Sequence, residues 1–269
     1  MRCVFAVHSG LALCCVVAVC GRCSLCRRSA LCRRSPVRSG CSLCCRSALC
    51  RSRSVRSRSP VRGGDPLMAG EEDRRQAAQE ALFCEQILLK GGDNVLRATL
   101  TDAPPAAWTH YPPGDVFDPA SGGQWYYHCH VPPAENEHGH FHCFVRPDGK
   151  DGPVHHLVAV GVDAHGRLQR LFTVNQWVVG DSWLDAEASI PLLERFDMQM
   201  PKPSYLTNRW LTAILRLYAD EIATLIRQRD VTIAAHQPPQ GIAARDDRAL
   251  EVTSELPVSL LDTAKALGL

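Results

Sequence analysis

The first 67 residues lack lysine, contain Asp65 as their one acidic residue and hold no aromatic residue after Phe5. They carry 13 arginines and 11 of the 14 cysteines in the chain. No apolar pattern surrounds these cysteines, and a segment without a core cannot offset the conformational entropy that folding removes. We therefore expect residues 1–67 to be a disordered Arg/Cys/Ser repeat segment, separate from a single domain over residues 68–269.

Residues 68–269 have few cysteines and no basic surplus. Cys84, Cys129 and Cys143 are the three cysteines that remain. This part of the chain has 17 basic and 27 acidic residues, a formal net charge of −10. Three scattered cysteines exclude a disulfide framework and indicate a reduced, cytoplasmic protein. The acidic surplus argues against a nucleic-acid partner for residues 68–269, since phosphate binding needs a basic surface.

Residues 23–40 and 41–58 form a tandem repeat with a period of 18 that matches at 13 positions. Each mismatch can arise from one base change between GC-rich codons, which is typical of duplicated DNA that drifts without selection on the protein. Met68 opens a sequence of different character. We interpret Met68 as the natural start and residues 1–67 as translated upstream sequence.

Other interpretations of residues 1–67 stay open. Arg2 and the apolar stretch after it resemble a secretory leader, and we expect no membrane partner for the domain unless this leader is real. Two C-x-x-C pairs, at residues 23–26 and 41–44, have the spacing of a zinc-binding tract, although they arise from the repeat. The arginines could also form a basic arm for nucleic acid or anionic lipid.

Alternation of apolar and polar residues predicts the strands of the domain. They lie at residues 124–131, 139–146, 156–162 and 167–174, with a further strand over 250–258. Strands in series with short links imply an antiparallel meander. We expect residues 103–123, which are rich in Pro, Gly and Asp, to form an irregular connection.

Apolar residues at helical spacing predict the helices that cover this sheet. They lie at residues 77–89, 94–100, 190–196 and 259–267, with one long helix that carries an apolar stripe from 211 to 226. Ser204 or Thr207 is the expected cap of the long helix. The predicted fold class is α+β, with an antiparallel sheet of about four to five strands covered by helices.

The most informative feature of the domain is a cluster of histidines. Its members are His128, His130, His138, His140, His142, His155 and His156. Side chains two apart in a strand point to the same face, so positions 128 and 130 form one row and positions 138, 140 and 142 form another. Pairing His128 with His140 or with His142 brings the rows together, with Cβ atoms about 4.5 to 5.5 Å apart.

These rows predict a metal site. Three or four imidazoles at this separation can hold Zn, Fe or Mn, and Glu137 in the hairpin loop can add a carboxylate. A bound metal could polarise a substrate or activate water, with Glu137 as general base. The odd-numbered side chains from Trp125 to Val145 are apolar, so we expect them, Cys129 and Cys143 included, to form core. The expected bystanders are His110, His155, His156, His165 and His236.

Two interpretations need no metal at the histidines. The face could be a pocket for an anionic small molecule, or an inert hydrogen-bonded network. Asn208 and Arg209 lie at a predicted helix N-terminus, where backbone N–H groups and a guanidinium could bind an anionic cofactor. A structural cap and a surface ion pair are the alternative for these two residues.

Two known motifs resemble this region. His128-x-His130, followed by Glu137 and Gly139, is similar to the first cupin motif, which implies a β-barrel with Fe, Mn or Zn on two His, one Glu and a distal His. The spacing here is longer than usual, and no convincing second motif follows. Residues 138–144, HGHFHCF, resemble the histidine-triad signature of nucleotide hydrolases and transferases, which implies His140 as nucleophile on a phosphate. Gly139 departs from that pattern.

A longer resemblance is to an uncharacterised bacterial family of unknown function. The matching segments are HYPPGDVFDP (110–119), YYHCH (126–130), EHGHFHCFVR (137–146), HLVAVGVDAHGR (156–167), LFTVNQWVVGDSW (171–183) and TNRWLTAILRLY (207–218). This resemblance supports Met68 as the start and implies no activity. Our leading hypothesis is a cytoplasmic domain that binds a divalent metal and a small-molecule ligand. The expected metal residues are His128, His130, His140 and His142, with His138 and Glu137 as additional groups.

Overall fold

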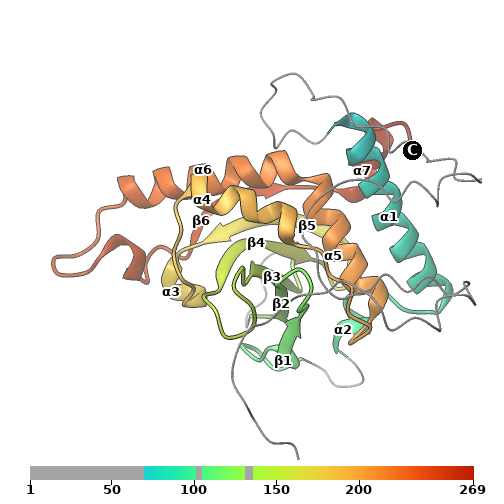
Figure 1. The fold of residues 1–269 in the computed structure, drawn as a ribbon, viewed down its shortest axis with the longest axis horizontal. Helices are drawn as coiled ribbons and strands as arrows, with labels where there is room; N and C mark the ends of the chain where they lie inside the picture. The colour runs from blue at the N-terminus through green and yellow to red at the C-terminus, as the bar shows by residue number, and fades with distance from the viewer. Residues whose placement is uncertain (1–69, 101–104, 131–135) are drawn as a thin grey trace, which may run out of the picture. The chain divides into compact units, whose positions relative to one another are not determined.

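The computed structural model describes residues 70–100, 105–130 and 136–269, so every interpretation of residues 1–67 lies outside the described residues. A six-stranded antiparallel sheet forms the centre of this part, in the order β1-β2-β3-β4-β5-β6 (Figure 1). The strands are β1 Tyr111–Phe117, β2 Gly123–His128, β3 Gly139–Val145, β4 His155–Val162, β5 Leu168–Val174 and β6 Val252–Pro257. The α+β class and the meander are confirmed, with one strand more than expected.

The additional strand, β1, lies where we expected an irregular connection. Its sequence, YPPGDVF, contains two prolines, which cannot donate to a sheet ladder and are tolerated at a sheet edge or a bulge. Both conditions hold, because β1 is the edge strand and its register with β2 shifts between Tyr111 and Val116. Gly114 and Asp115, with φ of 84° and 56°, lie within this shift. Alternation of side chains is lost there, which is why the pattern concealed the strand.

The long helices lie on one side of the sheet (Figure 1). The α-helices are α1 Glu71–Lys90, α2 Arg97–Leu100, α3 Gln176–Val179, α4 Ala186–Ser189, α5 Tyr205–Leu217, α6 Ala219–Ala235 and α7 Leu260–Ala266. Two 3₁₀ turns, η1 Ile190–Arg195 and η2 Ala244–Asp246, complete the described elements. Ser204 is the cap of α5, since its side chain accepts a hydrogen bond from the Thr207 N–H.

The prediction of one long helix after Ser204 is wrong, because α5 ends at Leu217 and α6 begins at Ala219. Between them Tyr218 has φ −108° and ψ 25°, outside helical geometry. Its hydroxyl bonds to Thr263 of α7 at 2.7 Å and donates to the Ser259 carbonyl at 3.2 Å. Both helices bury their apolar faces in the same core. The apolar stripe therefore continues across the break and conceals it.

The hydrophobic core lies between the sheet and the helices. Trp125, Tyr127 and Phe141 point into it from β2 and β3, all fully buried, and Phe141 faces Trp210 of α5 at 6.2 Å between ring centroids. Burial of each such side chain contributes about 1.5 to 3 kcal/mol. Cys129 and Cys143 are buried in this cluster as free thiols. The prediction that odd positions of this hairpin form core is confirmed.

A bulge between β3 and β4 changes which side chains share a face. Cys143 pairs with Val158, but Phe144 pairs with His156, so Leu157 is the extra residue. Such a residue reverses the alternation of the strand before it. His156 therefore lies on the face opposite the core, together with His128, His140 and His142.

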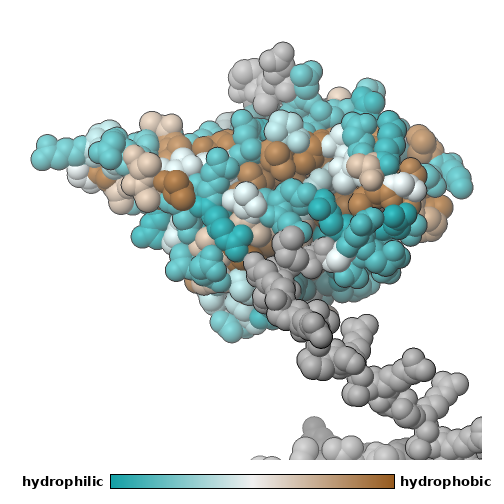
Figure 2. All heavy atoms as spheres, turned by 90° about the horizontal axis from the view of Figure 1, so that it is seen from above, coloured by the Kyte–Doolittle hydropathy of each residue, from teal (hydrophilic) through white to brown (hydrophobic). Residues whose placement is uncertain are grey.

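The surface of the helical side is mixed. Figure 2 shows hydrophobic and hydrophilic residues interleaved over the face that it presents. Among the described residues, no helix combines the length and the apolar composition that a membrane crossing needs.

Candidate metal centre

Register brings the predicted histidine rows together. His128 of β2 pairs directly with His140 of β3, one of the two registers that keep the even positions on one face. His142 follows on β3, and His130 lies two residues beyond His128, past the end of β2. His128, His140 and His142 are buried, with 7%, 4% and 0% exposure, and His130 is partly exposed. The cluster thus runs from the sheet interior to its rim.

The ring nitrogens of this cluster converge on one atom, Nε2 of His128. It lies 2.7 Å from Nε2 of His140, 3.2 Å from Nε2 of His142 and 3.4 Å from Nε2 of His130. Nitrogens at about 2.0 to 2.1 Å from one ion are about 2.9 to 3.4 Å apart in octahedral or tetrahedral geometry. His128, His130 and His140 offer ligand atoms that all lie within 4.8 Å of one another. These three histidines could hold a metal ion.

Hydrogen bonds alone do not account for this convergence. Burial and the neighbouring His140 lower the pKa of His128 to about 3, so its imidazole is neutral and carries one ring proton. Nε2 of His128 carries either one proton or one lone pair in the ring plane, so it can form a good hydrogen bond with at most one of the three nitrogens around it, and the other two contacts are unfavourable. Burial also holds the pKa of His142 well below its ordinary value. A cation at the centre would turn these repulsions into bonds.

Glu137 and Arg170 fix the orientation of His140. The His140 Nδ1–H donates to Oε1 of Glu137 at 2.8 Å, which directs Nε2 toward the cluster. Oε2 of Glu137 accepts from Nε of Arg170 at 2.5 Å. Burial alone raises the pKa of Glu137, but these hydrogen bonds outweigh it and hold the pKa below its ordinary value. A carboxylate behind a histidine is the usual support of a metal-binding imidazole.

Gly161 of β4 makes room for this ion pair. A Cβ at that position would overlap Oε2 of Glu137 and touch the Arg170 side chain. The missing side chain therefore lets the carboxylate lie flat on the sheet, within reach of both partners.

His156 supports His142 from behind. Its Nε2 lies 3.1 Å from Nδ1 of His142, and burial together with Arg229 lowers the pKa of His156 to about 3. We expected His156 to be a bystander, and the bulge after Cys143 explains why it is not. One partner for Nδ1 leaves Nε2 of His142 directed at His128.

Trp108 and His110 lie at the rim of the cluster. The Trp108 indole is 63% exposed and packs on His130 at 4.2 Å between ring centroids. Its φ of 64° is in the left-handed region, where a bulky residue is strained. His110 stacks on Tyr126 at 3.6 Å, and its Nδ1 is 3.2 Å from Asp115. The expected bystander His110 thus belongs to the surroundings of the histidine face.

A pocket of about 190 Å³ adjoins the cluster. Its lining consists of His130, Glu137, His138, Gly139, His140, Arg170, Phe172, Glu251 and Val252. Phe172 contacts His140 edge-on at 4.9 Å, and the Arg170 guanidinium lies over its ring at 4.1 Å. His130 and His140 are therefore reached from the pocket, whereas His128 and His142 lie behind them.

His138 does not join the other histidines. It precedes β3, and its Nδ1 forms a 2.6 Å hydrogen bond with the hydroxyl of Tyr127, a residue of the opposite face. The strand alternation on which we placed it in the row begins one residue later, at Gly139. Both oxygens of Glu137, the expected general base, are engaged by His140 and Arg170.

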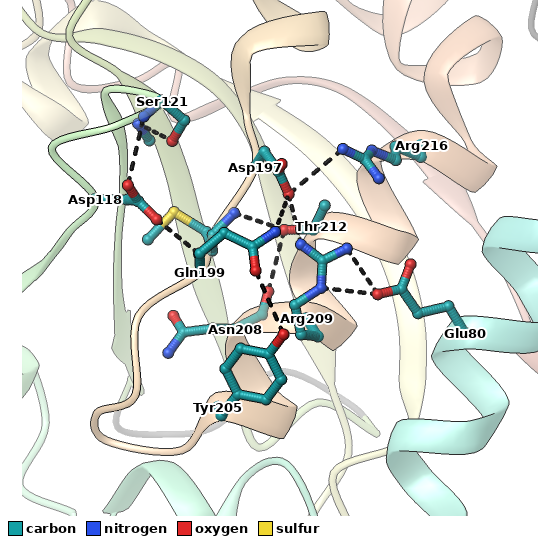
Figure 3. A network of polar contacts seen from close by, with 12 residues as sticks. Glu80, Asp118, Ser121, Asp197, Gln199, Tyr205, Asn208, Arg209, Thr212 and Arg216 are labelled. Carbon is teal, nitrogen blue, oxygen red and sulfur yellow. Dashed lines mark hydrogen bonds and ion pairs between the residues drawn. The ribbon is translucent and has the colours of Figure 1, made fainter. Parts of the chain in front are cut away.

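Asn208 and Arg209 lie on α5, on the helical side of the sheet, and Figure 3 shows the network of polar contacts around them. Oδ1 of Asn208 accepts from the Trp125 indole at 2.7 Å, and Nδ2 donates to the Met200 carbonyl at 2.9 Å. Arg209 forms ion pairs with Glu80 of α1 and with Asp197. These partners engage the polar atoms that we expected to bind an anion. The structural alternative fits only in part, because the cap is Ser204 and the ion pairs of Arg209 are buried and not on the surface.

Sequence reasoning missed Arg170, Glu251 and the role of His156. Arg170 could have been predicted from the sequence, because alternation along β5 places it on the same face as Phe172 and Val174. Glu251 immediately precedes β6 and reaches the cluster through the pairing of β5 with β6, a long-range contact that no local pattern encodes.

Comparison with known families gives one match. The model of a family described as Domain of unknown function (DUF6969) fits residues 75–258. No curated protein and no solved structure matches the chain. The predicted resemblance to an uncharacterised family is confirmed.

Proposed function

We propose that this chain, which belongs to the DUF6969 family of domains of unknown function, binds a divalent transition metal on its histidine face. His128, His130 and His140 would be ligands, with His142 as a fourth nitrogen donor on the buried side. The observation that carries the proposal is the convergence of three imidazole nitrogens on Nε2 of His128, within 2.7 to 3.4 Å. A neutral ring cannot satisfy them all with one proton.

The donor set bears on the identity of the metal. Imidazole nitrogens suit Zn²⁺ and Fe²⁺, whereas Mn²⁺ prefers carboxylates, carbonyls and water. Glu137, the nearest carboxylate, is engaged by His140 and Arg170 and would act behind the ligands. We therefore propose Zn²⁺ or Fe²⁺ in preference to Mn²⁺.

The position of the pocket supports a metal-dependent enzyme. His130 and His140 border it, so a five- or six-coordinate ion would keep an open side toward the pocket. The ion would polarise a bound molecule or activate water there. Glu137 would hold His140 in its ligand tautomer, a positioning role that suits its lowered pKa better than proton abstraction does.

Elemental analysis of the full chain tests the proposal. Wild type should carry about one equivalent of metal more than a His128→Ala/His140→Ala double variant. Any metal on the N-terminal cysteines is common to both proteins and cancels in the comparison. His165→Ala is the matched control, because His165 is exposed on the β4–β5 turn. Equal metal content in wild type and the double variant would exclude the site.

Thermal unfolding separates loss of the site from loss of the fold. The unfolding transition of the metal-free double variant establishes that it is folded, although it lacks the hydrogen bond that His140 donates to Glu137. Added Zn²⁺ at 100 times its Kd should stabilise wild type by about 2.7 kcal/mol and the variant much less. An equal shift in both proteins would contradict the assignment.

A further inference from the structure

We infer that the pocket beside His130 and His140 binds a small uncharged hydroxyl or hydroxamic-acid compound at the metal, with Glu251 as the base that takes its O–H proton. The inference rests on the proposed metal site and adds the ligand class and a catalytic residue. The two can fail separately, because metal binding is measured without the ligand.

The pocket limits the size of the ligand. Its volume of about 190 Å³ equals that of about six water molecules at roughly 30 Å³ each. Phe172 and Val252 supply apolar surface, and the histidines and charged residues of the lining supply polar surface. A molecule of a few heavy atoms, with one oxygen toward the metal and a short apolar part on Phe172, fits this lining.

Glu251 is the carboxylate in the lining that is free to act. Within the described part of the chain, its side chain has no hydrogen-bond or ion-pair partner, whereas Glu137 is engaged through both oxygens. It lines the same pocket as His130 and His140. A free carboxylate beside an open metal position can accept a proton from a metal-bound water, hydroxyl or hydroxamic acid.

The charges around the pocket favour an uncharged ligand. Glu137 and Glu251 line it, and Glu255 shares the Arg170 guanidinium with Glu137 at 2.7 Å. These three carboxylates and one arginine leave two negative charges, which a divalent ion neutralises. A phosphate would add charge to a neutral site and meet the unpaired Glu251, which opposes the nucleotide chemistry that the histidine-triad resemblance implies.

Acetohydroxamic acid is a suitable probe, because it is uncharged at neutral pH and binds metals through two oxygens. On binding, its oxygens form bonds to the metal and displace water, and its O–H proton passes to the Glu251 carboxylate. The full chain would be loaded with Co²⁺, and the visible spectrum of the His128→Ala/His140→Ala variant would be subtracted. Acetohydroxamic acid should change the difference spectrum at lower concentration than inorganic phosphate does.

Two variants locate the response. Val252→Trp should keep the Co²⁺ and lose the spectral response, because the indole fills the pocket. Glu251→Gln should keep the Co²⁺ and weaken acetohydroxamic acid binding at least about ten-fold, since the proton loses its acceptor. Glu187→Gln on α4, whose side chain is 81% exposed, is the matched control and should match wild type.

The outcomes separate the two proposals. If wild type binds no more Co²⁺ than the double variant, the metal site itself is wrong. If Co²⁺ binds but Val252→Trp and Glu251→Gln respond like wild type, or if phosphate binds more tightly than acetohydroxamic acid, the ligand assignment is overturned and the metal site stands. Circular dichroism and Co²⁺ content establish that each variant is folded.

Discussion

The Glu137 carboxylate orients His140, and its replacement by glutamine should weaken metal binding by about 10- to 100-fold. The side chain is 6% exposed and accepts the His140 Nδ1–H at 2.8 Å and the Arg170 Nε–H at 2.5 Å. Loss of one hydrogen bond to a charged group costs about 1.5 to 3 kcal/mol, which corresponds to a loss of metal affinity of about 10- to 100-fold. The amide of glutamine would also direct its N–H groups at either His140 or Arg170. Competition with a chromophoric chelator measures the metal affinity of the full chain.

Glu255→Gln is the control for Glu137→Gln. Glu255 bonds to the same arginine at 2.7 Å, but its side chain is 57% exposed and it does not contact a histidine. Its replacement should leave metal affinity within about two-fold and change unfolding free energy by less than about 1 kcal/mol. If Glu137→Gln binds metal as tightly as this control, the carboxylate does not orient the ligand and our reading of the site is refuted.

Three further predictions concern the surroundings of the cluster. Cu²⁺ should quench the Trp108 indole that packs on His130, so Trp108→Phe should remove most of the metal-dependent loss of tryptophan fluorescence. Burial lowers the pKa of His128 and His156 from 6.5 to about 3, so below pH 6.5 the unfolded chain binds protons that the folded protein does not. The metal-free protein should therefore keep its stability above pH 6.5 and lose about 2 kcal/mol of unfolding free energy per histidine at pH 5, as measured by urea titration. Unchanged urea midpoints between pH 8 and pH 5 would contradict that burial. Gly161→Ala should displace the Glu137 carboxylate and lower metal affinity, as measured by chelator competition. Gly149→Ala in the β3–β4 loop is the control and should lower metal affinity less, because a Cβ there meets no neighbouring atom.

Local patterns were sufficient for the central hairpin. Alternation from Trp125 to Val145 predicted which side chains form core, and the His128 to His140 pairing is one of the two registers that satisfied it. A one-residue slip of either strand would have moved Trp125 or Phe141 from the apolar core to the histidine face, so their burial in the core specifies the register. This part of the fold could be predicted from the sequence because its side chains alternate between the two faces of the sheet with a period of two residues throughout.

Irregular backbone marks the limit of that reasoning. The bulge beside Cys143 places His156 in the cluster, and the shift in β1 conceals an edge strand. His138 was assigned by parity to a strand that begins only at Gly139. Each of these errors follows from extending a two-residue period across a position where the backbone does not keep it.

The histidine face is costly to the metal-free protein, and that cost is itself an argument for a ligand. His128, His140 and His142 are buried polar side chains, and Nε2 of His128 can form a good hydrogen bond with only one of the other two, while the apolar core on the opposite face has no comparable conflict. Replacing such a buried network with apolar residues often leaves a fold equally or more stable. The unfavourable contacts of this protein are confined to the histidine face, where Glu137 supports His140 from behind and a pocket lies in front of it. This arrangement favours the binding of a ligand at the histidines.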